Sequence, residues 1–349
     1  MTKEQYGNKS KRVENIVSIT ENLAKIHGIS SEEYDTANFI IGLISDICDE
    51  IIVDKSGNVI GKITAEKDDA KTIMLEAHMD QIGLMISGID DDGFLKFTCV
   101  GGVDERILPS SDVVIFGKEK IGGVIFSATN SKDKNPEIGD LRIDTGLSAE
   151  KLNNLVKVGD LAVINGDFLC LNNTIYSGPA MDNRAGIAAV IDSVLNCHKS
   201  NYNIILFFSV QEELGLHGIY SGLNDISPDL AIIVDVTHGE TSDTKGNTGV
   251  FPLGCGAVIC KGPNFDFNYS KNLISLAKEN DIPYAIEVAS GPSGTDAWAI
   301  QIADSGIPCT LISIPLKYMH TNIETFDVSD VIAVADIITA VLEGGISID

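Results

Sequence analysis

Two adjacent acids, Glu212 and Glu213, follow a short run of apolar or small residues at 204–210. The run is too short to span a membrane, and its length and flanks are typical of a strand that is buried on both faces. The carboxyl end of such a strand is where open α/β sheets keep their functional sites. Neighbouring acids repel each other unless a positive group lies beside them, and a metal ion would supply that charge. A lone Glu-Glu pair more often belongs to a solvated loop, so the rest of the chain decides between the two interpretations.

Further histidines and acids stand at the ends of other predicted strands, and one acid stands at the start of a predicted helix. The strand ends carry His78, Asp80, Asp235 and His320, and Asp182 opens the helix 184–197. This mixture of imidazole and carboxylate groups suits zinc, cobalt or manganese. Each of these residues alone more often has a structural role, as a surface pair, a helix cap or a core histidine. Their joint placement at one edge of one sheet predicts a metal site.

The other histidines are weaker candidates. His27 and His198 stand at predicted helix ends, where an interaction with the helix dipole is a sufficient role. His217 and His238 lie close to candidate ligands in the sequence. For these two, a substrate-facing role and a structural role are equal alternatives.

Composition narrows the class of protein. The chain has 349 residues, 44% hydrophobic and 21% charged, which is enough for one large or two medium globular domains. Its formal charge of −25 argues against nucleic acid or an anionic membrane as a partner. The seven cysteines are scattered without a Cys-x-x-Cys pair, which predicts buried thiols in a reducing cytoplasm. The polar N-terminus and the lack of a long apolar run predict a chain that is neither exported nor anchored.

Both ends of the chain show the alternation of predicted helices and strands that is typical of an α/β domain, and the middle does not. Before residue 83 the sequence predicts a helix over 12–29, a second helix from a capping box at Ser30 to Ile47, a hairpin of strands 51–54 and 58–63, and a strand over 72–77. From about 83 to 176, short β-branched runs alternate with glycines, and only 148–155 has a helical pattern. This segment predicts a separate, barrel-like β unit.

After residue 178 the α/β alternation returns. The predicted helices cover 184–197, 268–280, 296–303 and 329–342, and the predicted strands cover 204–210, 231–236, 284–288 and 310–314. The β unit therefore interrupts an α/β domain.

Six sequence motifs carry a family resemblance. They are E-A-H-M-D-Q-I-G-L-M, S-G-P-A-M-D-N-R-A-G, Q-E-E-L-G-L-H-G, D-V-T-H-G, S-G-T-D-A and Y-M-H-T-x-x-E, in this order. Together they closely resemble the dinuclear metallo-aminopeptidases of the tetrahedral (TET) and glutamyl aminopeptidase family, some members of which are labelled endoglucanases or cellulases. The resemblance covers essentially the whole chain. It implies an α/β fold: a three-layer α/β/α catalytic domain with a central mixed sheet (1–82 and 177–349), interrupted by a β-rich, barrel-like dimerisation domain (83–176).

The resemblance also implies a role for each candidate residue. The implied ligands are Asp182 as a bridge between two divalent metal ions, Glu213 and His320 at one ion, and His78 and Asp235 at the other. Glu212 would be the general base, and Asp80 would orient His78 from behind. Zinc or cobalt is the expected metal. The residues alone lead to the same set but do not assign ligands to individual ions.

Two finer expectations follow from the same resemblance. It implies a cis peptide between Asp182 and Asn183. Three positions depart from the commoner pattern: Gln81 where many members have Glu, Lys317 where many have Arg, and Thr321 where many have Ser. None of the three is an implied ligand, so the departures concern the substrate pocket and not the chemistry.

The predicted activity is that of a metal-dependent aminopeptidase. A water bridging the two ions would be the nucleophile, and Glu212 would take its proton. A related dinuclear deacylase or carboxypeptidase would use similar ligands and is the alternative. A cellulase would need two carboxylates around a sugar site and no metal, so the five-ligand set argues against it. A non-catalytic assembly subunit would be expected to lack a ligand or the base.

The expected partners are peptides and further copies of the chain. The resemblance implies a homo-oligomer, a tetrahedral dodecamer whose interior admits peptides.

Overall fold

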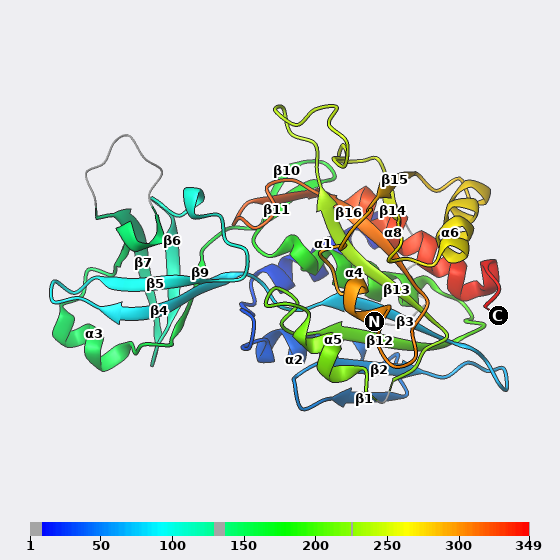
Figure 1. Ribbon diagram of the computed structural model, residues 1–349, viewed down its shortest axis with the longest axis horizontal. Coiled ribbons are helices and arrows are strands. Elements are labelled where there is room, and N and C mark those ends of the chain that lie inside the picture. The colour runs from blue at the N-terminus through cyan, green and yellow to red at the C-terminus, as the bar shows by residue number, and fades with distance from the viewer. Residues whose placement is uncertain (1–8, 129–136, 225, 349) are drawn as a thin grey trace.

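The computed structural model describes residues 9–128, 137–224 and 226–348. It has two parts, an α/β domain built from both ends of the chain and a β-barrel built from the middle (Figure 1). The barrel strands lie between residues 83 and 164, so the chain leaves the α/β domain after its third strand and returns after the barrel. The predicted interruption of an α/β domain by a barrel is confirmed.

An eight-stranded mixed sheet forms the centre of the α/β domain. Its strands, in spatial order, are β1 (Glu50–Val53), β2 (Val59–Ile63), β12 (Asn203–Ser209), β3 (Thr72–His78), β13 (Leu230–His238), β16 (Cys309–Leu316), β14 (Ala257–Lys261) and β15 (Tyr284–Val288). The middle strands β12, β3, β13 and β16 run parallel to one another, whereas β2 is antiparallel to β12 and β14 is antiparallel to β16. The parallel strands are buried on both faces along most of their length, as their apolar runs predict. Their carboxyl ends therefore meet at one edge of the sheet.

Helices cover both faces of the sheet, which confirms the three-layer prediction. The larger core involves α1 (Lys9–Ala24), α2 (Tyr34–Ile44), α4 (Met181–Asn196), α6 (Phe267–Glu279) and α8 (Val328–Ala340) with its π-helical extension η4 (Val341–Gly345). The short helices α5 (His217–Gly222) and α7 (Ala297–Ile300) close a smaller core on the other face. Each fully buried Ile or Leu side chain stabilises this packing by about 1.5–3 kcal/mol. Among the helices that the structure describes, none is both long and apolar enough to cross a membrane.

The first two helices differ from the sequence prediction at their ends. α1 ends at Ala24, well before the predicted end. The capping box predicted at Ser30 is wrong, because α2 begins at Tyr34 and its cap residue, Glu33, makes no side-chain capping hydrogen bond. The Ser30 hydroxyl donates instead to Asp80 Oδ2 at 2.6 Å. The Ser30 side chain therefore binds Asp80 at the candidate site and does not cap the helix.

The inserted unit is a closed, antiparallel, six-stranded barrel with its own apolar core. Its strands, in spatial order, are β4 (Gly83–Ile89), β5 (Leu95–Val100), β8 (Leu141–Asp144), β7 (Lys120–Ser127), β6 (Asp112–Phe116) and β9 (Leu161–Ile164), with the 3-10 turns η2 (Glu105–Ile107) and η3 (Ile138–Asp140) between them. Closure leaves no free strand edge. Leu84, Ile115 and Ile143 are fully buried inside. The helix expected near 148–155 is α3 (Ala149–Leu155), whose cap, Ser148, accepts a hydrogen bond from the Lys151 N–H.

Two strands after the barrel return the chain to the α/β domain. β10 (Leu169–Asn172) and β11 (Ile175–Gly178) form a three-stranded sheet with β17 (Glu324–Asp327). β11 leads into α4, which carries Asp182, and β17 follows the loop that carries His320. The pairing of β11 with β17 therefore brings two parts of the candidate site side by side. The domain boundaries at 83 and 176 stay a prediction.

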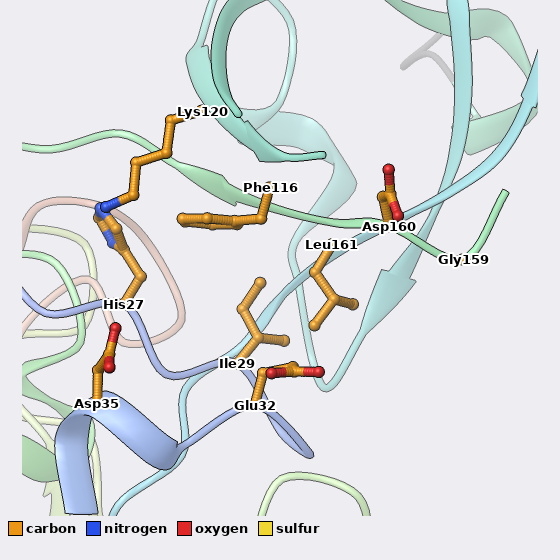
Figure 2. A pocket seen from close by; sticks show the side chains of 9 residues that line it. All are labelled: His27, Ile29, Glu32, Asp35, Phe116, Lys120, Gly159, Asp160 and Leu161. Carbon is orange, nitrogen blue, oxygen red and sulfur yellow. The ribbon is translucent and has the colours of Figure 1, made fainter. Parts of the chain in front are cut away.

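A cavity of about 300 Å³ lies where the barrel meets the segment after α1 (Figure 2). The ring centroids of His27 and Phe116 lie 5.3 Å apart, and Lys120 Nζ lies 5.6 Å from the Phe116 centroid. His27 therefore contacts the barrel, which corrects its predicted role at a helix end. Burial, together with the charges of Lys120 and Arg184, lowers the pKa of His27. The candidate metal ligands, all of which the structure describes, do not line this cavity.

Candidate metal centre

The carboxyl ends of the parallel strands bring the candidate residues to one edge of the sheet. The structure places His78 at the end of β3, Asp235 three residues before the end of β13, Glu212 and Glu213 after β12, His320 after β16, and Asp182 in the first turn of α4. All six side chains line one cavity of about 260 Å³. The sheet topology therefore brings residues that are far apart in the chain to one place, as their predicted positions at strand ends and at a helix start indicated.

Two groups of three ligand atoms are each compact enough to hold a metal ion, and Asp182 belongs to both. In the first group, His78 Nε2 lies 3.0 Å from Asp182 Oδ1 and 3.9 Å from Asp235 Oδ1. In the second group, His320 Nε2 lies 3.5 Å from Asp182 Oδ2 and 3.5 Å from Glu213 Oε1. Within each group, the ligand atoms lie within 4.8 Å of one another. The two oxygens of Asp182 thus face different groups, which is the arrangement that a bridging carboxylate needs.

The chemistry of this donor set fits a pair of divalent cations. It combines two imidazoles with three carboxylates, a mixture that zinc, cobalt and manganese accept. The site is also crowded with negative charge. Burial and the neighbouring Asp182 raise the pKa of Glu213 to about 7. Burial and the acids around it raise the pKa of Glu212 to about 10, and a hydrogen bond to Asp182 raises that of His320 to about 9. A divalent ion in each group would relieve this crowding.

Backbone contacts fix the position of Asp182. The Asp182–Asn183 peptide is cis, as predicted. The Asp182 N–H donates to Glu324 Oε2 at 2.9 Å, and the Asn183 side-chain amide donates to the Val234 carbonyl at 2.8 Å. Glu324 Oε1 accepts a second hydrogen bond, at 2.7 Å, from the His320 N–H. One buried side chain therefore holds two of the candidate ligands in a fixed relation.

Asp80 lies behind His78 and contacts three parts of the site. Its Oδ1 lies 3.4 Å from His78 Nδ1. It accepts hydrogen bonds from the N–H groups of Glu212 and Glu213, at 2.9 and 3.2 Å, and from the Ser30 hydroxyl. Burial alone would raise the pKa of Asp80, but the His78 imidazole and the bonds from Ser30 and Glu212 lower it. An ionised Asp80 can therefore orient the His78 ring and fix the segment that carries the two acids.

Sequence reasoning assigned no role to Glu76, Asp296 and Glu324, which the structure places around the ligands. The Ser209 hydroxyl lies 2.9 Å from Glu76 Oε1 and 2.6 Å from Asp296 Oδ2, so the end of β12 is tied to β3 and to the loop before α7. Burial raises the pKa of Asp296 to about 6, and burial together with Asp296 raises that of Glu76. All three acids lie inside the six sequence motifs, so their positions in these motifs could have identified them as candidates.

The remaining sequence candidates fall in different places. His238 lines the cavity of about 260 Å³, whereas His217 lies outside it. Gln81 and Thr321 line a smaller neighbouring space of about 20 Å³, together with two of the candidate ligands. Lys317 lines neither space.

Comparison with known proteins agrees with this geometry. The profile of the M42 glutamyl aminopeptidase family matches residues 57–337. The lysyl aminopeptidase of Pyrococcus furiosus is 32% identical over 329 residues, which cover 90% of this chain and 93% of that protein. The structure of aminopeptidase APDkam598 from the archaeon Desulfurococcus kamchatkensis is similar with a TM-score of 0.90 and 31% identity, over 95% of each chain. The TET1 peptidase of Pyrococcus horikoshii, which can assemble into a tetrahedron or a large octahedral shell, is similar with a TM-score of 0.83 and 31% identity, over 94% of this chain and 99% of its own.

These matches extend over most of the chain and include both the sheet edge with the candidate ligands and the inserted barrel. The proteins matched are aminopeptidases, which hydrolyse peptide bonds. The chain therefore belongs to the M42 glutamyl aminopeptidase family.

Proposed function

We propose that this protein removes N-terminal residues from peptides as a metal-dependent aminopeptidase. The observation that carries the proposal is the pair of three-ligand groups that share Asp182, with the further acid Glu212 lining the same cavity. When bound to these groups, two divalent ions, for which we expect zinc or cobalt, supply an activated water and polarise the scissile carbonyl. His78 and Asp235 would hold one ion, and Glu213 and His320 the other.

Glu212 is the residue that we assign to proton transfer. It belongs to neither ligand group, yet it lines the cavity and is only 9% exposed. Its backbone N–H donates a hydrogen bond to Asp80, which holds the Glu212 backbone in place beside the ligands. Burial and the surrounding acids raise the pKa of Glu212, and the positive charge of two bound ions would lower it again. The Glu212 carboxylate would then take a proton from the water as general base and return it to the leaving amine as general acid.

The charge of the cavity favours a peptide's N-terminus over its C-terminus. Its lining residues, all within the described part of the chain, include no Lys or Arg and five acids: Asp182, Glu212, Glu213, Asp235 and Glu287. Asp182, Glu213 and Asp235 would be neutralised by the two ions, but a terminal carboxylate would still find no Lys or Arg side chain in this lining to bind. This observation favours the aminopeptidase over the carboxypeptidase alternative. The histidine-containing ligand groups also argue against a cellulase, which would need a carboxylate pair and no metal.

A panel of aminoacyl-4-nitroanilides tests the proposed activity. We expect hydrolysis by the metal-loaded protein, loss of hydrolysis after chelation, and recovery when zinc, cobalt or manganese is added. Metal analysis should find two ions per chain. The matched control is the N-acetylated form of the best substrate, which lacks the free amine and should not be cleaved. Cleavage of the acetylated form, or full activity after complete removal of metal, would count against an aminopeptidase.

We also propose that the barrel mediates assembly into a dodecamer. The barrel has its own core and projects to one side of the α/β domain (Figure 1). It also exposes the apolar residues Val124 and Val158, which are 52% and 69% exposed. A similar protein, the TET1 peptidase of Pyrococcus horikoshii, can assemble into a tetrahedron or a large octahedral shell, and the similar PhTET1-12s structure contains a dodecamer. Light scattering at micromolar concentration, with metal present, should therefore give the mass of a dodecamer. A monomer under these conditions would exclude the proposal.

A further inference from the structure

One wall of the metal-centre cavity is built from side chains on a single face of the central sheet. Asp235 and Thr237 of β13, Leu311 and Ser313 of β16, Cys260 of β14 and Glu287 of β15 all line this cavity. The strand pairing explains why, because Asp235 is the partner of Ser313 and Cys260 is the partner of Glu287. Paired residues on neighbouring strands point to the same face of a sheet. The wall therefore continues without a break from a candidate metal ligand to the outermost strand.

Glu287 is the charged group at the far end of this wall. It accepts a hydrogen bond from the Thr237 hydroxyl at 3.1 Å. Thr237 lies two residues beyond Asp235 on the same strand, which places it about 6.6 Å farther along the sheet. Glu287 is half-buried, and within the described residues no Lys or Arg nitrogen lies within 4 Å of its carboxylate. The wall thus ends in a carboxylate that, in the described part of the chain, has no Lys or Arg partner; the ionisable base that acts on its pKa is His238.

Two residues of the wall between the two acids, Cys260 and Leu311, are apolar, beside the hydroxyls of Thr237 and Ser313. Cys260 is 1% exposed and Leu311 is 3% exposed, and both belong to the smaller core of the α/β domain. Ala289, two residues beyond Glu287, lines the same side of the cavity. A ligand on this wall would meet metal-binding groups at one end, the Cys260 and Leu311 side chains in the middle and a carboxylate at the other end.

We propose that this wall binds the side chain of the substrate's first residue, and that Glu287 selects lysine and arginine there. The inference rests on the proposed aminopeptidase function, because that function places the first residue beside the metal ligands. The hydrocarbon stem of a lysine or arginine would cover Cys260 and Leu311, and its charged head would reach Glu287. An N-terminal glutamate or aspartate would instead bring two negative charges together.

The first test is the substrate ranking of the unmodified, metal-loaded protein. kcat/KM should be at least about tenfold higher for lysyl- and arginyl-4-nitroanilide than for leucyl-4-nitroanilide, since a hydrogen bond between charged groups contributes about 10- to 100-fold. Glutamyl-4-nitroanilide should be the poorest substrate of the four. A ranking that places leucyl or glutamyl substrates first would overturn the assignment of Glu287 and leave the aminopeptidase proposal intact. If no anilide in the panel is hydrolysed with any metal, the two proposals fail together.

The second test is the change in that ranking when Glu287 is altered. Glu287→Gln keeps the volume and removes the charge, so the ratio of lysyl to leucyl kcat/KM should fall by about 10- to 100-fold. Glu287→Lys should reverse the preference, so that the glutamyl substrate overtakes the lysyl substrate. The matched control is Glu279→Gln on the exposed surface of α6, which removes an equal charge from a residue that does not line the cavity and should keep the ratio. An unchanged ratio in Glu287→Gln would overturn the inference, whatever its absolute rate.

Discussion

Replacing Glu212 with Gln is expected to lower kcat by about 10²–10⁴-fold, with little change in KM and with the metal content of the parent protein. Glu212 lines the cavity but belongs to neither group of candidate ligands, so the substitution removes no metal donor. Gln has the same volume and keeps the N–H that bonds to Asp80, so the segment should stay in place. What disappears is the carboxylate that takes and returns the proton. Steady-state kinetics and metal analysis of the same preparation measure both quantities.

Glu213→Gln is the matched control, because it makes the same chemical change at the next residue with a different expected result. Glu213 Oε1 lies 3.5 Å from His320 Nε2 within the second ligand group. A neutral amide is a weaker ligand for a dication, so this variant should lose metal and regain part of its rate when metal is added. Added metal should not help Glu212→Gln. If Glu212→Gln lost metal and Glu213→Gln stayed loaded but inactive, the two roles would be reversed.

The elements that the sequence predicted well are those with a strong periodicity of their own. The strand that became β12 and the helix that became α4 are long, apolar and bounded by turn residues, so their local pattern is sufficient. β14 was not predicted. It has five residues, as many as β15, which was predicted, so length alone does not explain the difference. The place of β14 in the sheet depends on pairing with β15 and β16, which lie well beyond it in the chain. Such short strands are defined by their partners more than by their own residues.

The ligands could be predicted because strand ends converge, but the residues that position them could not. Asp182 and Glu324 are 142 positions apart in the sequence, and Ser209 and Asp296 are 87 apart, yet each pair is joined by a hydrogen bond. Nothing in a local pattern shows that such residues meet. For Ser30, the local pattern gave a wrong prediction. It predicted a helix cap, whereas the hydroxyl donates to Asp80, which is distant in the sequence. Tertiary contacts decide between the local alternatives of a polar side chain.

Replacing Asp182 with Asn is expected to affect both metal positions at once. Asp182 is the only residue common to the two ligand groups found among the described residues, and each of its oxygens faces a different histidine. An amide offers one oxygen and no negative charge, so it cannot bridge two dications. Metal content should fall from two ions per chain to one or fewer, and kcat/KM should fall by at least about 10³-fold, because metal-ion catalysis contributes several kcal/mol.

Thermal unfolding with and without metal provides a second readout that does not depend on activity. An ion at 100 times its Kd stabilises the folded parent by about 2.7 kcal/mol, so Tm should rise on addition of metal, and this rise should largely disappear in Asp182→Asn. The matched control is Asp266→Asn at the cap of α6, since Asn also caps helices and this position lies outside the cavity. That variant should keep two ions and the metal-induced rise in Tm. If Asp182→Asn kept two ions, the metal-induced rise in Tm and the parent's rate, a bridging role for Asp182 would be excluded, and the assignment of the two ligand groups would be wrong.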